Sequence, residues 1–308
     1  MATAPPLPRE VDPDGYGPHG RSEWLDIDWN AHQRWVQVLG RRVNLVERGE
    51  GPPLLLVHGH SGCWQNWLEN IPHFARTHRV VAMDLPGFGF SEMPDWVSIE
   101  NYAAFLDALC SELGVDEAAV VGNSMGGFVG AELCARFPTR VTALVLVSAA
   151  GLSTRYLGFS SEFYRRKSVR AFARLTNAYA TIPEARAETL VRRRRLRRAV
   201  LRAVVKYPER LPGPLTAELL RGSGRPAAPF ATDAIVSYDF RDRVGQISCP
   251  TLVVWGADDR IVPVEAADSY ERAIPDARKV VFPETGHVPM VERPAAFNGL
   301  LDEFLAAV

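Results

Sequence analysis

The segment from Ala118 to Gly127 constrains the fold most, because it predicts a buried strand that turns abruptly into a helix. Its one serine, Ser124, lies at the corner. A serine at the tip of such a turn takes a strained backbone conformation, so the residues two positions before and after it must be small, and here both are glycine, Gly122 and Gly126. Apolar residues at helical spacing follow from Met125, which would place the positive end of a helix dipole beside Ser124. The pattern favours a nucleophile elbow over an ordinary glycine and serine turn.

A serine on such an elbow needs a base that follows it, because the chain order of this arrangement is serine, acid, histidine. Of the 7 histidines only His287 follows Ser124. It lies in a loop after the short apolar run 279–282, where a strand would deliver it to the carboxyl edge of a sheet. The sequence therefore predicts His287 as the general base.

Two carboxylates compete for the role of the acid that orients this histidine. Asp258 and Asp259 follow the apolar run 251–256 directly. Only one of them can accept the imidazole N–H and hold a single tautomer. The other is expected to face solvent or to pair with Arg260, as turn residues commonly do.

Two further segments stand before the elbow, Leu-Leu-Leu-Val-His-Gly-His at 54–60 and Met-Asp-Leu-Pro-Gly-Phe-Gly-Phe-Ser at 83–91. With the elbow and the loop of His287, they resemble the ordered motifs of the α/β-hydrolase superfamily. The resemblance covers residues 32–305 and is to the lid-bearing branch of esterases, lipases and carbon–carbon bond hydrolases. It implies that Asp259, three residues after the glycine that closes its strand, is the acid of the triad.

The same resemblance implies an oxyanion hole formed by the backbone N–H groups of His60 and Met125. Gly59, Asn123 and the two elbow glycines would then support the loop and the turn. His60 also forms a pair with His58 that could face one side of a strand and hold a metal. No further cysteine or histidine cluster lies nearby in the sequence, so no metal site is predicted.

The fold class predicted is α/β, an α/β-hydrolase fold with a mostly parallel eight-stranded sheet and helices on both faces. The first two strands should form an antiparallel hairpin that turns at Gly40, and the later ones are apolar on both faces, which is typical of a parallel sheet. The strands are expected at 34–39, 42–47, 54–58, 80–84, 118–122, 141–147, 251–256 and 279–282, and helices at 99–113, 125–136 and 294–307.

The connection between Ser148 and Thr251 is far longer than the crossover that a parallel sheet requires. We interpret it as a helical lid inserted after the sixth strand, so that the chain divides into an N-terminal arm at 1–30, a core at 31–150 and 245–308, and a lid at 151–244. The lid carries an arginine-rich run at 192–198. A solvated helix face is the favoured interpretation of this run, against a carboxylate-binding lid or a helix that meets anionic lipid.

Several classes are disfavoured by composition and motif content. The formal net charge of -1 gives no general attraction to nucleic acid, and neither a Walker pattern nor a dinucleotide-binding glycine motif is present, so no cofactor is predicted. No apolar stretch is long enough for a transmembrane segment, and the first twenty residues lack the apolar run of a secretory signal. The 4 widely spaced cysteines are expected to be reduced core residues of a cytoplasmic protein. The sequence leaves a homodimer open.

The predicted activity is hydrolysis of a small or medium hydrophobic carboxylic ester through an acyl-enzyme on Ser124. A serine at this position argues against the dehalogenases and epoxide hydrolases that share the fold, because they use a carboxylate nucleophile. The alternative is a carbon–carbon bond hydrolase of the meta-cleavage type, whose elbow is similar. Two departures weaken it: Val288 stands where that group usually has tryptophan, and residues 58–64 replace its glycine-rich loop. A non-catalytic ligand-binding member of the fold is a third hypothesis.

Overall fold

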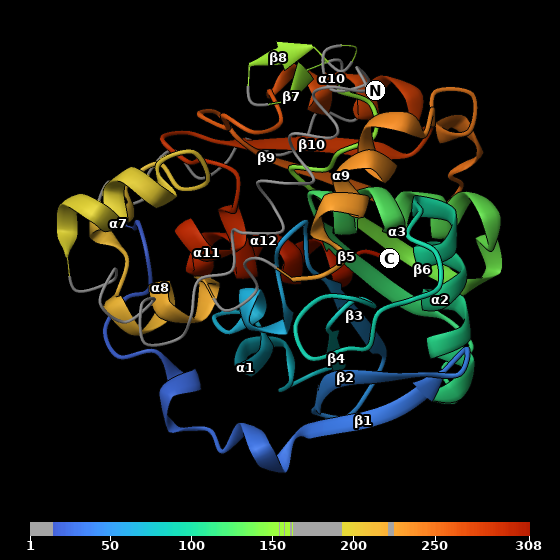
Figure 1. Ribbon diagram of the computed structural model, residues 1–308, viewed down its shortest axis with the longest axis horizontal. Helices are drawn as coiled ribbons and strands as arrows, with labels where there is room; N and C mark the ends of the chain where they lie inside the picture. Colours follow the sequence, from blue (N-terminus) through green and yellow to red (C-terminus); the bar gives the residue numbers. More distant parts are fainter. Residues whose placement is uncertain (1–14, 154, 157, 161, 163–192, 221–224) are drawn as a thin grey trace.

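Eight strands form one sheet in the order β1-β2-β4-β3-β5-β6-β9-β10 in a computed structural model that describes residues 15–153, 155–156, 158–160, 162, 193–220 and 225–308 (Figure 1). Each predicted strand is present, with ends that differ by at most two residues. β1 pairs with β2 and β2 with β4 in antiparallel fashion, and every later pair is parallel. The strands are β1 Gln33–Val38, β2 Arg41–Arg48, β3 Pro53–Val57, β4 Arg79–Met83, β5 Ala118–Asn123, β6 Val141–Val147, β9 Thr251–Gly256 and β10 Ala277–Phe282.

The hairpin between β1 and β2 turns where the sequence predicts. Leu39 and Gly40 have φ angles of 51° and 75°, the left-handed conformation that a two-residue hairpin loop requires at both central positions. Glycine adopts this conformation without steric cost, which explains why the turn falls here.

Both faces of the sheet are covered, as the apolar strands predict. On β3, Leu54 and Leu56 pack into one core with residues of α1 and α12, whereas Leu55 and Val57 pack into the other with residues of α2, α3 and α10. The central strands are therefore buried on both sides. The helices of the core, counted over both faces of the sheet, are α1 Ile71–Phe74, α2 Ile99–Glu112, α3 Met125–Arg136, α10 Glu265–Ala273, α11 Pro289–Glu292 and α12 Pro294–Leu305.

The inserted segment between β6 and β9 contains α7 Arg194–Leu201, α8 Gly213–Leu220 and α9 Ala228–Ser237. It also contains a small antiparallel hairpin, β7 Arg155–Tyr156 with β8 Phe159–Ser160, which the helical prediction missed because each strand has only two residues. In Figure 1, α7 and α8 lie on one side of the molecule, and α9 lies away from them, on the side of α3. Residues 163–192, which include Arg192 of the arginine-rich run, and residues 221–224 lie outside the described residues, so the helical prediction is tested only on the rest of the segment.

The described part of the N-terminal arm packs against the core. Trp24 is buried, and both Ser22 Oγ and Trp24 Nε1 donate hydrogen bonds of 2.7 Å to Glu69 Oε1. Tyr16 is also buried. Residues 15–31 therefore wrap the surface of the core.

Short 3-10 helices in the described part of the chain lie at Glu23–Asp26, Trp29–Ala31, Trp64–Trp67, Pro138–Arg140, Pro208–Arg210 and Val244–Gln246.

All four cysteines are buried free thiols, as predicted for reduced core residues. Two of them are close: Cys134 Sγ on α3 lies 3.2 Å from Cys249 Sγ, the distance of a thiol hydrogen bond. Within the described residues, we find no helix with the length and apolar character needed to cross a membrane.

Candidate active site

The predicted elbow is present between β5 and α3. Ser124 has φ 56° and ψ −116°, a conformation that non-glycine residues rarely adopt. A Cβ added to Gly122 would lie 2.3 Å from the carbonyl oxygen of Gly126, and one added to Gly126 would lie 2.3 Å from that of Val57. Both positions therefore require glycine, for the reason that the sequence suggested.

The predicted base and acid are hydrogen-bonded to each other. His287 Nδ1 lies 2.8 Å from Asp259 Oδ2, and both side chains are almost fully buried. The other carboxylate oxygen, Oδ1, accepts the backbone N–H groups of Ile261 at 2.8 Å and Val262 at 3.0 Å. Because the carboxylate accepts, Nδ1 carries the proton and Nε2 is left as the basic nitrogen.

Asp258 has a different role from its neighbour. Its Oδ1 lies 2.5 Å from Lys206 Nζ in the inserted segment. The sequence suggested solvent or Arg260 as the partner of the second aspartate, and the actual partner is Lys206. Local turn chemistry could not indicate a lysine so distant in the chain.

Asn123 connects the elbow to the loop of His287. Its Nδ2 donates to the carbonyl oxygen of Val147 at 3.1 Å and to that of His287 at 3.2 Å. The residue before the serine thus fixes both the end of β6 and the histidine backbone. Met125 follows as the first residue of α3, so its N–H has no acceptor inside the helix.

His58 shapes the loop that approaches the serine. Its Nδ1 donates to the carbonyl oxygen of Gly59 at 2.7 Å, and its Nε2 accepts the N–H of Leu85 at 2.9 Å. Burial lowers the pKa of His58 to about 4, so the ring is neutral at pH 7, and both nitrogens are used by the backbone. Gly59 lies so near the elbow that an added Cβ would be 2.9 Å from Ser124 Cβ.

The side chain of His60 joins this loop to α9. Its Nε2 lies 2.8 Å from the carbonyl oxygen of Ala228 and 3.0 Å from Thr232 Oγ1, and its Nδ1 lies 3.0 Å from Ser61 Oγ. Burial lowers the pKa of His60, which favours the neutral ring. A neutral ring that donates from Nε2 to the carbonyl can accept the Ser61 hydroxyl at Nδ1.

This contact predicts a stability effect. Replacement of His60 by leucine should lower the free energy of unfolding by about 1–3 kcal/mol, because the Ala228 carbonyl and the hydroxyls of Thr232 and Ser61 each lose one hydrogen bond. The hydroxyl of Thr232 still donates to the Ala228 carbonyl at 3.2 Å. Urea unfolding followed by circular dichroism measures the change. Thr232→Val is the matched control, since it removes one hydroxyl only and should cost about 0.5–1.5 kcal/mol. Equal losses of unfolding free energy in the two variants would contradict the role of the His60 side chain in linking this loop to α9.

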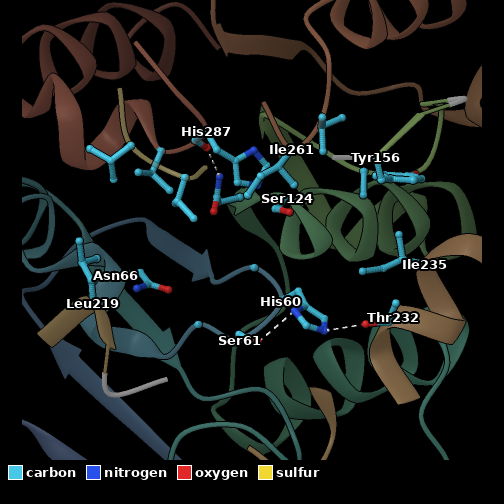
Figure 2. A pocket seen from close by; sticks show the side chains of 18 of the residues that line it. His60, Ser61, Asn66, Ser124, Tyr156, Leu219, Thr232, Ile235, Ile261 and His287 are labelled. Carbon is cyan, nitrogen blue, oxygen red and sulfur yellow. Dashed lines mark hydrogen bonds between the residues drawn. The ribbon is translucent and has the colours of Figure 1, made fainter. Parts of the chain in front are cut away.

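Ser124, His287 and His60 open onto one cavity of about 490 Å³ (Figure 2). The core supplies the polar groups around the serine, and the inserted segment supplies mainly apolar walls. The described lining residues include no lysine or arginine; Asn66, Ser61 and Thr232 add polar groups away from the serine. Apolar side chains from the inserted segment that line the cavity include Tyr156, Leu201, Val204, Leu219 and Ile235.

The arginine-rich run does not reach this cavity through the side chains that the structure describes. Arg193, Arg195 and Arg198 are exposed, and the half-buried Arg197 donates to the carbonyl oxygen of Glu209 at 3.0 Å. The three exposed arginines fit the solvated helix face that the sequence favoured, whereas Arg197 binds the backbone of the inserted segment. None of the four lines the cavity.

Two contacts that the sequence did not predict hold the histidine loop. The N–H of His287 donates to the carbonyl oxygen of Val204 at 2.8 Å, and the buried Glu292 accepts the N–H of Gly286 at 2.9 Å. A carboxylate directly after the apolar run 288–291 was the one available signal for Glu292. Val204 acts through its backbone, which leaves no mark in the sequence.

The chain matches a family model described as "alpha/beta hydrolase fold" over residues 52–294, more than half of its length. It is 30% identical over 293 residues to the 2-hydroxy-6-oxo-2,4-heptadienoate hydrolase of Pseudomonas putida, covering 89% of this chain and 96% of that protein. It is 32% identical over 273 residues to a dihydrolipoyllysine-residue acetyltransferase component of the acetoin cleaving system from Pseudomonas putida, covering 88% of this chain and 68% of that one. A thermophilic esterase from Thermogutta terrifontis superposes with TM-score 0.67 and 25% identity, covering 89% and 98% of the two chains.

Proposed function

The chain belongs to the α/β-hydrolase fold family, and from that premise we propose that it is a serine hydrolase with Ser124 as nucleophile, His287 as base and Asp259 as orienting acid. The observation that carries the proposal is the buried 2.8 Å contact of His287 Nδ1 with Asp259 beside the strained serine, at one apolar cavity. In this proposal residues 31–150 and 245–308 form the catalytic core, and residues 151–244 form the lid.

The triad and its surroundings have distinct tasks. His287 takes the proton of the attacking nucleophile at Nε2, and Asp259 stabilises the imidazolium that results. The oxyanion is bound by the backbone N–H groups of Met125, at the start of α3, and of His60, in the loop that Gly59 brings against the elbow. The helix dipole of α3 favours negative charge at the same place.

The substrate class we propose is a 2-hydroxy-6-oxo-dienoate, and the bond cleaved is the carbon–carbon bond beside the 6-oxo group. Support comes from the relative of that activity, which aligns over 89% of this chain. Tautomerisation of the 2-hydroxydiene to the keto form makes the carbon beside the 6-oxo group a leaving group, because its electron pair is then delocalised to the 2-oxo oxygen. Addition of one water across the bond gives a carboxylic acid and a 2-hydroxydienoate, with no change of oxidation state overall.

The ester activity expected from the sequence is therefore the second candidate rather than the first. One observation favours it: the cavity is apolar, with no lysine or arginine among its described lining residues, as suits a neutral acyl group. The structural likeness to an esterase at 25% identity points the same way. A dienoate carboxylate would instead depend on neutral donors such as Asn66 and Thr232.

A paired turnover assay separates the two. The wild type should cleave 2-hydroxy-6-oxo-2,4-heptadienoate with kcat/KM at least about tenfold above that for p-nitrophenyl esters of graded chain length, a difference of about 1.4 kcal/mol in transition-state binding. Loss of the dienolate absorbance and release of nitrophenolate measure the two rates. The reverse preference would identify carboxylic esters as the substrates. Turnover of neither would contradict both candidates and favour a non-catalytic binding role.

A further inference from the structure

We propose that Tyr16 and Glu292 form a positioning pair that holds the loop of His287 in place and makes the N-terminal arm part of the active site. This inference rests on the proposed function in one respect, the role of His287 as the base. The two residues are far apart in the chain, and neither lines the cavity that Ser124 opens onto. They are therefore not substrate-binding residues, and any influence on the reaction passes through the histidine loop.

Glu292, the last residue of α11, is fully buried and accepts hydrogen bonds on both sides of His287. Its Oε1 accepts the N–H of Gly286 at 2.9 Å and that of Val288 at 3.3 Å. These are the residues directly before and after the histidine. The carboxylate thus fixes the backbone from which the imidazole extends.

The same carboxylate ties the inserted segment to this loop. Glu292 Oε2 accepts the N–H of Lys206 at 2.8 Å, and two residues earlier the carbonyl of Val204 accepts the N–H of His287 at 2.8 Å. The approach is close, since a Cβ added to Gly286 would lie 2.7 Å from the carbonyl oxygen of Val204. The backbone of the histidine is therefore held by α11 and by the segment that follows α7.

Tyr16 completes the arrangement from the N-terminal arm. Its hydroxyl donates to Glu292 Oε2 at 2.6 Å and accepts the N–H of Tyr207 at 2.8 Å. The ring packs edge-on against Tyr207. The guanidinium carbons of Arg210 and Arg293 lie over the Tyr16 ring, 5.2 Å and 5.1 Å from its centroid. One phenol thereby joins the arm, the inserted segment and the carboxylate behind the histidine loop.

Burial makes this carboxylate sensitive to the loss of any donor. Desolvation raises the pKa of Glu292, and its hydrogen bonds, with that of Tyr16 foremost, act in the opposite direction. A buried carboxylate that loses its strongest donor relaxes by moving or by binding water, and Gly286 and Val288 move with it. Displacement of a catalytic group by about 1 Å can cost about 10²-fold in rate.

The test uses two tyrosine-to-phenylalanine variants of the full chain. Tyr16→Phe removes the buried hydroxyl, whereas Tyr207→Phe removes a hydroxyl that donates to the exposed Glu284 at 2.9 Å and keeps the same packed ring. A fluorophosphonate probe measures activation of Ser124 directly, because its serine–phosphorus bond forms as fluoride leaves. We expect Tyr16→Phe to lower the labelling rate and kcat about tenfold with KM within about twofold, and Tyr207→Phe to match the wild type.

Each outcome has one meaning, provided that labelling is done at a temperature where circular dichroism shows every variant folded. A wild type that the probe does not label would contradict the proposed function itself. A labelled wild type with an equally reactive Tyr16→Phe variant would overturn the positioning pair, even if that variant melted at a lower temperature, because a purely structural role shifts melting alone. Glu292→Gln should slow labelling by more than Tyr16→Phe, and the double variant should be no slower than Glu292→Gln, since both act through one carboxylate.

Discussion

Replacement of Ser124 by alanine is expected to lower kcat by about 10⁶-fold, the loss measured when a serine nucleophile is removed from a triad. The loss follows from chemistry rather than folding. Alanine keeps the Cβ that the positive φ of 56° already accommodates, and only the reactive oxygen is deleted. The turnover of dienoate and ester substrates measures the effect, and product binding by calorimetry checks that the cavity survives.

Retained turnover in this variant would remove Ser124 from the mechanism. A rate within tenfold of the wild type would mean that another group attacks the carbonyl or that water attacks it directly. A rate loss with lost product binding would instead indicate damage to the elbow. Comparison of the circular dichroism spectra of the two proteins distinguishes damage from chemistry.

Replacement of Asp259 by asparagine should lower kcat by about 10⁴-fold with the fold intact. An amide in this place keeps the shape of the side chain, but it no longer holds His287 with the proton on Nδ1 or stabilises the imidazolium. The carboxylate is suited to that task because Ile261 and Val262 fix its second oxygen. Steady-state kinetics on the better of the two substrates measure the loss.

Asp258→Asn is the matched control, since it makes the same chemical change one residue earlier. Asp258 pairs with Lys206, and both side chains are partly exposed. Such a pair contributes only about 0–1 kcal/mol to stability, and neither residue lines the cavity, so kcat should change by no more than about fivefold. A larger loss in Asp258→Asn than in Asp259→Asn would reverse the assignment of the acid.

The fold could be predicted because its signals are local. Each central strand is a short apolar run that is buried on both faces, and the Leu39–Gly40 turn and the elbow at Ser124 depend on neighbours in the chain. The pairing of His287 with Asp259 followed from motif order in the family. Those features needed no knowledge of how distant segments pack.

Contacts between distant segments were beyond the sequence. The hydrogen bond of Tyr16 with Glu292 joins residues 276 positions apart, and the partner of Asp258 proved to be Lys206. The first depends on how the N-terminal arm packs against the core, and the second on where the inserted segment returns to it. The preference for ester over carbon–carbon bond cleavage also rested on local departures such as Val288, whose side chain forms only part of the cavity wall. The bulk of one wall residue affects the size of the substrate that the cavity accepts, and it does not determine which bond is cleaved.

The position of the inserted segment has a consequence for how new specificities can arise. The proposed nucleophile, base and acid lie on the core, whereas most of the described apolar wall of the cavity lies on the segment between β6 and β9. Mutations in that segment can change which substrates fit the cavity while the proposed catalytic residues keep their places. Recombination that exchanges only this segment between related genes would therefore change substrate selectivity and leave the catalytic residues unchanged.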